Sequence, residues 1–345
     1  MATALLALGV AAAPLAWGAD VPGSVDLPAL ANPASGEHQP GRVVWMDLVI
    51  PSLPTEERFY TSLLGWSFRQ LSSGQEPYAL AMVNGQPVAS LIQRQLPRNG
   101  QRAPAWLGFV SANDLDAVTR VALAQGARQR SPVRIYPQRG RQIVLQDPQG
   151  GVFGVVSATG GDPPDTLALP GQWIWSALFT GDPDNEAAFY QKVFGYDVYD
   201  LTDQSDQASA ATDPNAQPPA AAAASTGGIE HLQLASAEYA RASVNGVPQE
   251  QAQRPARWLH FVRVEDAAAA AAKAQSLGAR VLVQPRADRQ GGRVAVIADP
   301  AGALLGLMEW SDSDADASAS VGSASGPATQ GADTGAAAPP PSPTP

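Results

Sequence analysis

The same unit occurs twice in this chain of 345 residues. The stretch 45–66, WMDLVIPSLPTEERFYTSLLGW, reappears as WSALFTGDPDNEAAFYQKVFGY at 175–196, an offset of 130 residues. Further on, Trp106 matches Trp258 at an offset of 152, so 22 residues have been inserted between the two blocks of the second copy. A repeat of this length predicts two tandem copies of one structural module. Each copy also serves as a control for the other.

Periodicity in the first copy predicts strands and helices in a fixed order. The pair Asn84-Gly85 is a strong hairpin signal, and Gly65 is typical of a helix C-terminus. The predicted elements are strand 43–50, helix 54–64, strands 78–83, 87–93 and 106–111, helix 115–125, and strands 141–146 and 152–156.

The second copy repeats this order. It predicts strand 173–180, helix 186–194, a hairpin near Asn245-Gly246, strand 258–264, helix 266–277 and a hairpin over 294–307. Each copy is therefore a pair of βαβββ units. The fold class is α+β with mixed sheets rather than a doubly wound parallel fold.

Three motifs recur in this frame: FY-x-x-x-x-G-[WY] after the opening strand, W-L-x-F-V before a helix, and D-P-x-G before the last strand. Together they resemble the vicinal oxygen chelate (VOC) superfamily, which includes glyoxalase I, bleomycin- and fosfomycin-resistance proteins and extradiol dioxygenases. The resemblance implies two glyoxalase-like modules, at 41–160 and 171–310, each with curled mixed sheets around a cleft. In this superfamily a divalent metal usually binds the substrate in the cleft.

The resemblance also implies where metal ligands would lie. None of the matched side chains offers a lone pair to a cation, and His38, the first of three histidines, lies outside the modules. The chain thus resembles the metal-lacking side of the superfamily, and we predict no metal and no cofactor. The matched positions are Trp45, Leu107 and Gly154 in the first copy and Trp175, Leu259 and Gly306 in the second.

Strand alternation places Trp45, Asp47 and Val49 on one face of the first strand. If the family geometry holds, Asp47 points into the cleft, where it could act as a base or hold a donor group of a ligand. The alternative is an ion pair or a solvated rim position. The second copy has Ala177 here, so such chemistry would be confined to the first.

Aromatic and apolar side chains complete the predicted clefts. The two matched tryptophans either form stacking platforms or fill the space of a lost metal. Strand parity directs His260 beneath a helix, and we expect His231 at the surface, with a cleft mouth as the alternative. The predicted ligand-binding residues are Trp45, Asp47, Trp175, Leu107, Phe109, Leu259 and Phe261, with Asp47 as the catalytic candidate.

Outside the modules the composition changes. Residues 1–19 are apolar and uncharged and are predicted to be a signal peptide, which favours a periplasmic or secreted protein. The missing positive n-region leaves a cytoplasmic protein as the alternative, and the stretch is too short for a confident membrane span. Residues 20–40 are predicted to be a linker, 203–228 a low-complexity insertion and 311–345 a disordered tail.

These observations favour a metal-independent protein that binds a small organic molecule of aromatic or apolar character. One alternative is a lyase, isomerase or dioxygenase that uses Asp47 or non-standard metal ligands. Another is an envelope scaffold without catalysis. The net charge of −10 argues against a nucleic-acid partner. Two modules can pair within one chain, which permits a monomer as well as a homodimer.

Overall fold

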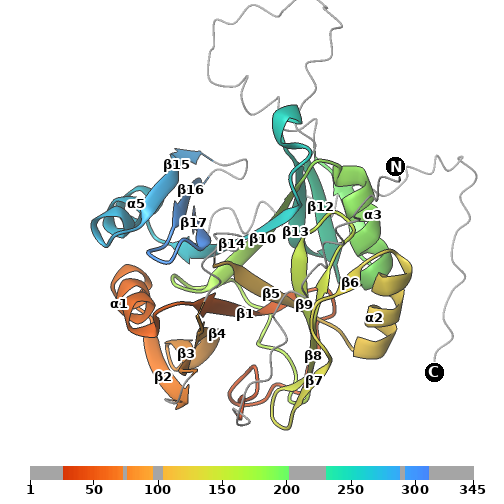
Figure 1. The fold of residues 1–345 in the computed structure, drawn as a ribbon, viewed down its shortest axis with the longest axis horizontal. Helices are drawn as coiled ribbons and strands as arrows, with labels where there is room; N and C mark the ends of the chain where they lie inside the picture. The colour runs from red at the N-terminus through yellow and green to blue at the C-terminus, as the bar shows by residue number, and fades with distance from the viewer. Residues whose placement is uncertain (1–25, 73–75, 96–103, 202–230, 288–291, 311–345) are drawn as a thin grey trace, which may run out of the picture. The chain divides into compact units, whose positions relative to one another are not determined.

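Two mixed β-sheets, one from each copy of the repeat, form the frame of the protein (Figure 1). The structure is a computed structural model that describes residues 26–72, 76–95, 104–201, 231–287 and 292–310. The predicted signal peptide, insertion and tail lie outside the described residues. No helix in the described part is long and apolar enough to cross a membrane.

The first sheet has the strand order β2-β3-β4-β1-β5-β9-β8-β6, with β7 paired to β8. Strand β1 pairs parallel with β4 and antiparallel with β5, so the two βαβββ units join at the centre of the sheet. Its elements are β1 (Val43–Ile50), α1 (Leu53–Leu64), β2 (Ser67–Ser72), β3 (Tyr78–Val83), β4 (Gln86–Gln93), β5 (Trp106–Ser111), α2 (Leu115–Ala124), β6 (Arg128–Gln129), β7 (Arg134–Tyr136), β8 (Gly140–Gln146) and β9 (Val152–Ala158).

The second sheet repeats this order as β11-β12-β13-β10-β14-β17-β16-β15. The predicted fold class, two tandem modules with curled mixed sheets, is confirmed. The elements are β10 (Trp173–Thr180), α3 (Pro183–Phe194), β11 (Asp197–Asp200), β12 (His231–Ser236), β13 (Tyr239–Gly246), the 3₁₀ helix η1 (Gln249–Gln251), β14 (Arg257–Val264), α5 (Ala267–Ser276), β15 (Arg280–Ala287), β16 (Arg293–Ala298) and β17 (Leu304–Glu309).

Local sequence explains where the helices begin and end. The carboxylate of Asp114 accepts hydrogen bonds from the backbone N–H groups of Asp116 and Ala117 at 2.9 Å, which caps α2. Asp266 caps α5 in the same way. Helix α1 ends at Gly65, whose φ of +73° would strain any residue with a Cβ.

The hairpin predicted near Asn245-Gly246 is wrong. The turn lies at Ala237-Glu238, where both residues have positive φ (51° and 66°), as Asn84 and Gly85 do in the first module. Asn245 instead pairs with Phe179 of β10 near the end of β13. The pairing of β12 with β13 therefore imposes a turn on Ala237 and Glu238, which have little intrinsic preference for one. The Asn-Gly pair, normally a strong turn signal, instead lies at the end of β13.

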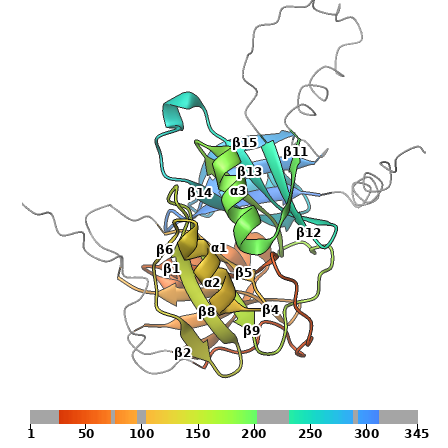
Figure 2. The same cartoon turned by 90° about the vertical axis from the view of Figure 1, so that its right-hand side faces the viewer.

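The hydrophobic core lies between the two modules rather than inside each one. Helix α1 packs beside α5, and α2 packs beside α3 (Figures 1 and 2). One apolar cluster joins Met46 and Leu48 of the first module to Val262 and Leu305 of the second, and another joins α2 to α3. The modules therefore pair within the chain. The concave faces of the two sheets form separate, smaller apolar clusters.

The three recurring motifs meet at this pairing surface. The hydroxyl of Tyr60 on α1 donates to Asp299 Oδ2 in the D-P-x-G turn of the other module at 2.7 Å. The indole Nε1 of Trp106 donates to the same hydroxyl at 3.2 Å. The equivalent chain runs in the opposite sense through Trp258, Tyr190 and Asp147, with hydrogen bonds of 3.0 and 2.9 Å.

A buried glutamate accompanies each of these turns. Burial, reinforced by the charge of Asp299, raises the pKa of Glu56 to about 8. In the same way, burial and the neighbouring Asp147 raise the pKa of Glu186 to about 10. Each glutamate is 1 % exposed, so both carboxyl groups belong to the pairing surface and not to a cleft.

Candidate ligand site

The polar centre of the first module is a hydrogen-bonded group on its concave face. Trp45 and Asp47 lie on the same face of β1, as strand alternation predicts, and the indole Nε1 donates to Asp47 Oδ1 at 2.8 Å. Ser90 of β4 lies opposite Asp47 in the sheet, and its Oγ is 3.2 Å from the same indole nitrogen. Tyr78 donates to Ser90 Oγ at 2.7 Å. The sheet register thus brings four polar side chains together.

Asp47 is buried, with 8 % of its surface exposed. Burial raises the pKa of its carboxyl group, while the nearby Arg139 and the hydrogen bond from Trp45 oppose that rise. A buried carboxyl group with a raised pKa is able to take up or release a proton closer to neutral pH than an exposed one.

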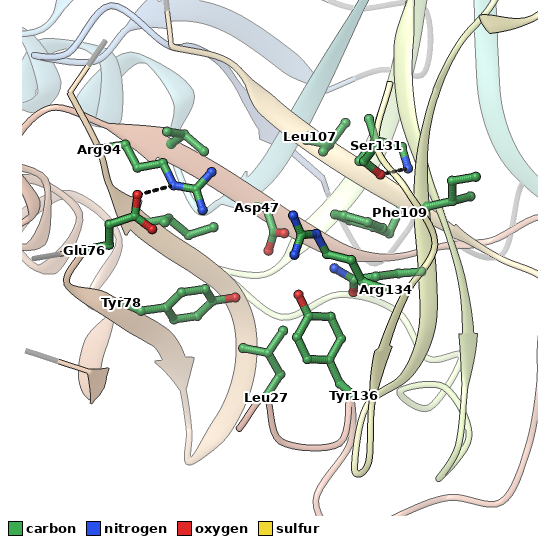
Figure 3. A pocket seen from close by; sticks show the side chains of 15 residues that line it. Leu27, Asp47, Glu76, Tyr78, Arg94, Leu107, Phe109, Ser131, Arg134 and Tyr136 are labelled. Carbon is green, nitrogen blue, oxygen red and sulfur yellow. Dashed lines mark hydrogen bonds and ion pairs between the residues drawn. The ribbon is translucent and has the colours of Figure 1, made fainter. Parts of the chain in front are cut away.

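A cavity of about 70 Å³ opens over this centre. Figure 3 shows Asp47 in the middle of it, with the side chains of Arg94 and Arg134 on opposite sides and the hydroxyls of Tyr78 and Tyr136 pointing inward. Leu107 and Phe109 of β5, two of the residues predicted to contact a ligand, form part of the apolar wall. The site therefore combines an apolar wall with converging polar groups, the usual composition of a small-molecule pocket.

Arg139 lies beside this site, 1 % exposed. Its guanidinium carbon is 4.0 Å from the centroid of the Trp45 ring, and its Nε donates to the carbonyl oxygen of Pro28 at 3.1 Å. Neither Nη1 nor Nη2 has a hydrogen-bond partner among the described residues. Sequence reasoning missed the arginines and Tyr136, since none of them lies in a motif shared by the two copies. Arg94, Tyr136 and Arg139 are absent from the second copy, which was the available signal, whereas Arg134 is matched by Arg286.

The N-terminal segment covers the first cleft. Residues 26–40, expected to be a linker, form no helix or strand, but Leu27 and Leu30 are 2 % and 1 % exposed and pack with Trp45 and Phe109. The segment lacks the periodicity that identifies a core element, yet two leucines three residues apart are enough to fill an apolar cleft. Leu27 also lines the cavity.

The residues at the matched metal positions do not fit a divalent metal. A Cβ at Gly154 would overlap the ring of Phe109, and one at Gly306 would overlap the ring of Phe261. The phenyl rings occupy the place that a ligating carboxylate side chain would need. Among the described residues, no three His, Cys, Asp or Glu side chains lie together as a metal-binding group.

The second module carries a related but different set of side chains. Trp175 Nε1 donates to Ser243 Oγ at 3.2 Å, as Trp45 does to Ser90, but Ala177 replaces Asp47. His231 is half-buried, and its Nδ1 lies 2.6 Å from Asn245 Oδ1. Leu259 and Phe261 lie in the apolar cluster of this cleft with Trp175 nearby.

His260 belongs to neither cleft. Its Nδ1 is 2.8 Å from Ser176 Oγ, its ring stacks on Trp258 with an interplanar angle of 3°, and it packs against Gly108 of the other module. It therefore lies at the pairing surface rather than beneath a helix. Burial lowers the pKa of His260 to about 3, so the imidazole is neutral.

Two family models match the chain in regions that coincide with the two sheets. The model described as the Glyoxalase/Bleomycin resistance protein/Dioxygenase superfamily matches residues 174–307, and that described as a Glyoxalase-like domain matches residues 44–156.

Two of the following three proteins are similar to this chain over most of both modules, and DauV is similar over a shorter stretch. "Putative glyoxylase CFP32" of Mycobacterium tuberculosis is 28% identical over 279 residues, which are 80% of this chain and 98% of that protein. The anthracycline biosynthesis protein DauV of a Streptomyces species is 32% identical over 117 residues, which are 34% of this chain and 42% of DauV. The crystal structure of a Mn(II)-bound glyoxalase from Novosphingobium aromaticivorans has a TM-score of 0.52 at 15% identity, over 79% of this chain and 83% of that one.

Proposed function

This chain belongs to the glyoxalase/bleomycin resistance protein/dioxygenase superfamily, and on that premise we propose that it binds a small organic molecule in its first module without a metal ion. The observation that carries the proposal is the cavity over Asp47, where apolar side chains and converging polar groups meet. Every position that matches a metal ligand of the family holds a side chain without a lone pair for a metal ion, which supports metal independence.

The second module supports a difference in role between the two clefts. It keeps the tryptophan–serine hydrogen bond but has Ala177 where the first module has Asp47. We therefore place the ligand in the first module, and expect one bound molecule per chain.

The test combines metal analysis with ligand screening of the purified full chain. Elemental mass spectrometry with and without added zinc, iron, manganese and nickel is expected to find far less than one metal ion per chain. A panel of small aromatic and apolar metabolites and antibiotics is then screened by thermal shift, and binders are titrated by calorimetry with and without a chelator. Binding that the chelator abolishes contradicts metal independence.

The repeat offers a matched control for the location of the ligand. Trp45→Phe and Trp175→Phe each remove one indole donor to a serine, in the first and the second cleft respectively. Only the Trp45 substitution is expected to weaken binding. A panel without any binder, or a binder sensitive only to Trp175→Phe, would overturn the proposal.

The raised pKa of Asp47 favours a second candidate function, proton transfer to or from the bound molecule. In that case Asp47→Asn would retain binding of the ligand and abolish its turnover. Mass spectrometry of the reaction mixture measures the turnover. If the ligand is recovered unchanged after long incubation with the unmodified protein, proton transfer is excluded and only the binding function remains.

We also propose that the protein is exported, because residues 1–19 have the apolar, uncharged character of a signal sequence core. Mass spectrometry of the protein recovered from the cell envelope or the medium of its native host would then show a chain that begins after this stretch. A full-length chain confined to the cytoplasm would contradict export.

A further inference from the structure

We propose that the molecule bound in the first module is a small organic anion, whose carboxylate or phosphate group enters the cavity among Arg94, Arg134 and Arg139. This inference rests on the proposed function, since it names the chemical class of the ligand for the same site.

The surroundings of the cavity carry more positive charge than the chain as a whole. The chain carries a net charge of −10. Among the described residues, Arg94 and Arg134 line the cavity together with the carboxyl groups of Asp47 and Glu76, and Arg139 beside it adds a third positive charge. Arg94 is paired with Glu76, with Nε 3.2 Å from Oε1, while the carboxylate of Asp47 accepts from an indole. An excess of positive charge in a buried site favours an anionic occupant.

The hydroxyl of Tyr136 shares the cavity with these charged groups. Burial raises the pKa of Tyr136, Arg134, Arg139 and Arg94 oppose that rise, and Asp47 adds to it. Figure 3 shows the Tyr136 hydroxyl pointing toward Asp47 from the side of the cavity that faces Leu27.

Arg139 supplies an independent reason. A guanidinium group with 1 % exposure and two nitrogens without partners among the described residues is costly to bury. Burial lowers the pKa of Arg139, and Tyr78, Asp47 and Tyr136 oppose this effect. An anion in the adjoining cavity would add the negative charge that this group lacks. Arginine is also the side chain whose geometry best matches a carboxylate or phosphate.

The rest of the cavity wall indicates the chemical character of the rest of the ligand. It is mostly apolar and includes Leu27, Leu107 and Phe109. The cavity volume of about 70 Å³ is roughly half that of the engineered apolar cavity of ~150 Å³ that holds benzene. It therefore encloses a charged head group, and a larger apolar body attached to that group must extend beyond the cavity.

The second module lacks this arrangement. At the positions equivalent to Asp47, Arg94 and Arg139 the sequence has Ala177, Val247 and Gly291, while Arg134 is matched by Arg286, which is exposed. One anion per chain is the expected stoichiometry.

The experiment uses the full chain and probes that differ in charge but not in their aromatic body. Benzoate and phenyl phosphate are titrated by calorimetry beside benzyl alcohol, phenol and benzylamine, at low and moderate salt. We expect one or both anions to bind at one per chain, at least about tenfold more tightly than the neutral and cationic probes, because only the anions form charge-assisted hydrogen bonds with both partners charged. The anion that binds more tightly identifies the head group.

Arg94→Gln and Arg134→Gln are expected to weaken anion binding by about tenfold each. Arg141→Gln is the matched control, because Arg141 is exposed and forms its ion pair with Asp116 away from the cavity. Thermal unfolding establishes that each variant is folded.

The outcomes separate this inference from the proposed function. If neutral probes bind as tightly as benzoate and phenyl phosphate, or if anion binding survives both arginine substitutions, the anionic class is wrong while binding in the first module stands. If no probe and no member of the wider panel binds, both fail.

Discussion

His260 lies against Gly108, the glycine that occupies the equivalent position in the first module. The two positions have the same register, opposite Ser176 and Met46 respectively. A Cβ at Gly108 would come within 2.7 Å of the imidazole Cε1. Equivalent positions that touch one another must lie beside the approximate twofold axis that relates the two modules. Only one large side chain fits there.

This contact predicts a non-additive pair of substitutions. Gly108→Ala should lower the free energy of unfolding by about 1–3 kcal/mol, because the added methyl group overlaps a buried ring. In a His260→Ala background the same change should cost much less. Urea unfolding of the two single variants and the double variant measures the coupling. Strictly additive effects would show that the two positions do not share space.

The buried glutamates predict that stability falls as the pH rises. The folded protein holds the pKa of Glu56 at about 8, above its ordinary value of 4.5, so it binds the proton more tightly than the unfolded chain. The resulting stabilisation is complete below about pH 4.5 and is lost as the pH rises through about 8. Glu186, with a pKa of about 10, extends the loss to higher pH.

Urea unfolding at pH 5, 7 and 9 tests this dependence. We expect a loss on the order of 2 kcal/mol between pH 5 and 9, and a smaller loss in Glu56→Gln, which cannot ionise. Glu265→Gln, at an exposed position, serves as the control and should keep the slope of the unmodified protein. A stability that increases with pH over this range would contradict the assignment.

The crossed tyrosine–aspartate hydrogen bonds predict that the two halves of the pairing surface contribute equally to the free energy of unfolding. Tyr60→Phe and Tyr190→Phe each leave a buried aspartate without its hydroxyl donor and should cost about 1–3 kcal/mol. Tyr239→Phe, at an exposed position, should change the free energy of unfolding by less than about 0.5 kcal/mol. An effect from only one of the two buried tyrosines would show that the halves are not equivalent in energy.

The N-terminal segment predicts a stability effect at a position that the sequence places outside any domain. Leu30→Ala should lower the free energy of unfolding by about 2–5 kcal/mol, because the side chain is buried against the first cleft. Leu167→Ala, at a leucine that is 44 % exposed, is the matched control. Chemical denaturation of both variants provides the comparison, and equal effects would mean that residues 26–31 do not pack as described.

The sequence predicts the fold well because its two copies check each other. A weak motif such as D-P-x-G becomes informative when it recurs in the same order, and the strands, helices and mixed sheets follow from it. The prediction fails where one copy departs from the usual signal, as at Ala237-Glu238, whose turn is imposed by pairing of β12 with β13.

The candidate site is only partly predictable for the opposite reason. Strand alternation brings Trp45 and Asp47 together, but Arg94 and Arg139 have no counterpart in the second copy, and no periodicity identifies them. The recurring motifs that were most visible in the sequence serve the pairing surface instead: Tyr60 and Asp299 hold the modules together. The repeated motifs identify the residues that pair the two modules. The candidate site of the first module instead depends mostly on residues that differ between the copies.

Leu27 and Leu30 have a further consequence for any titration of the first cleft. They belong to the same chain as the cleft they fill, so dilution cannot remove them and their effective concentration at the cleft is fixed. A ligand larger than the cavity must compete with this tethered segment. Its apparent dissociation constant is then the intrinsic one divided by the fraction of molecules in which the segment has withdrawn.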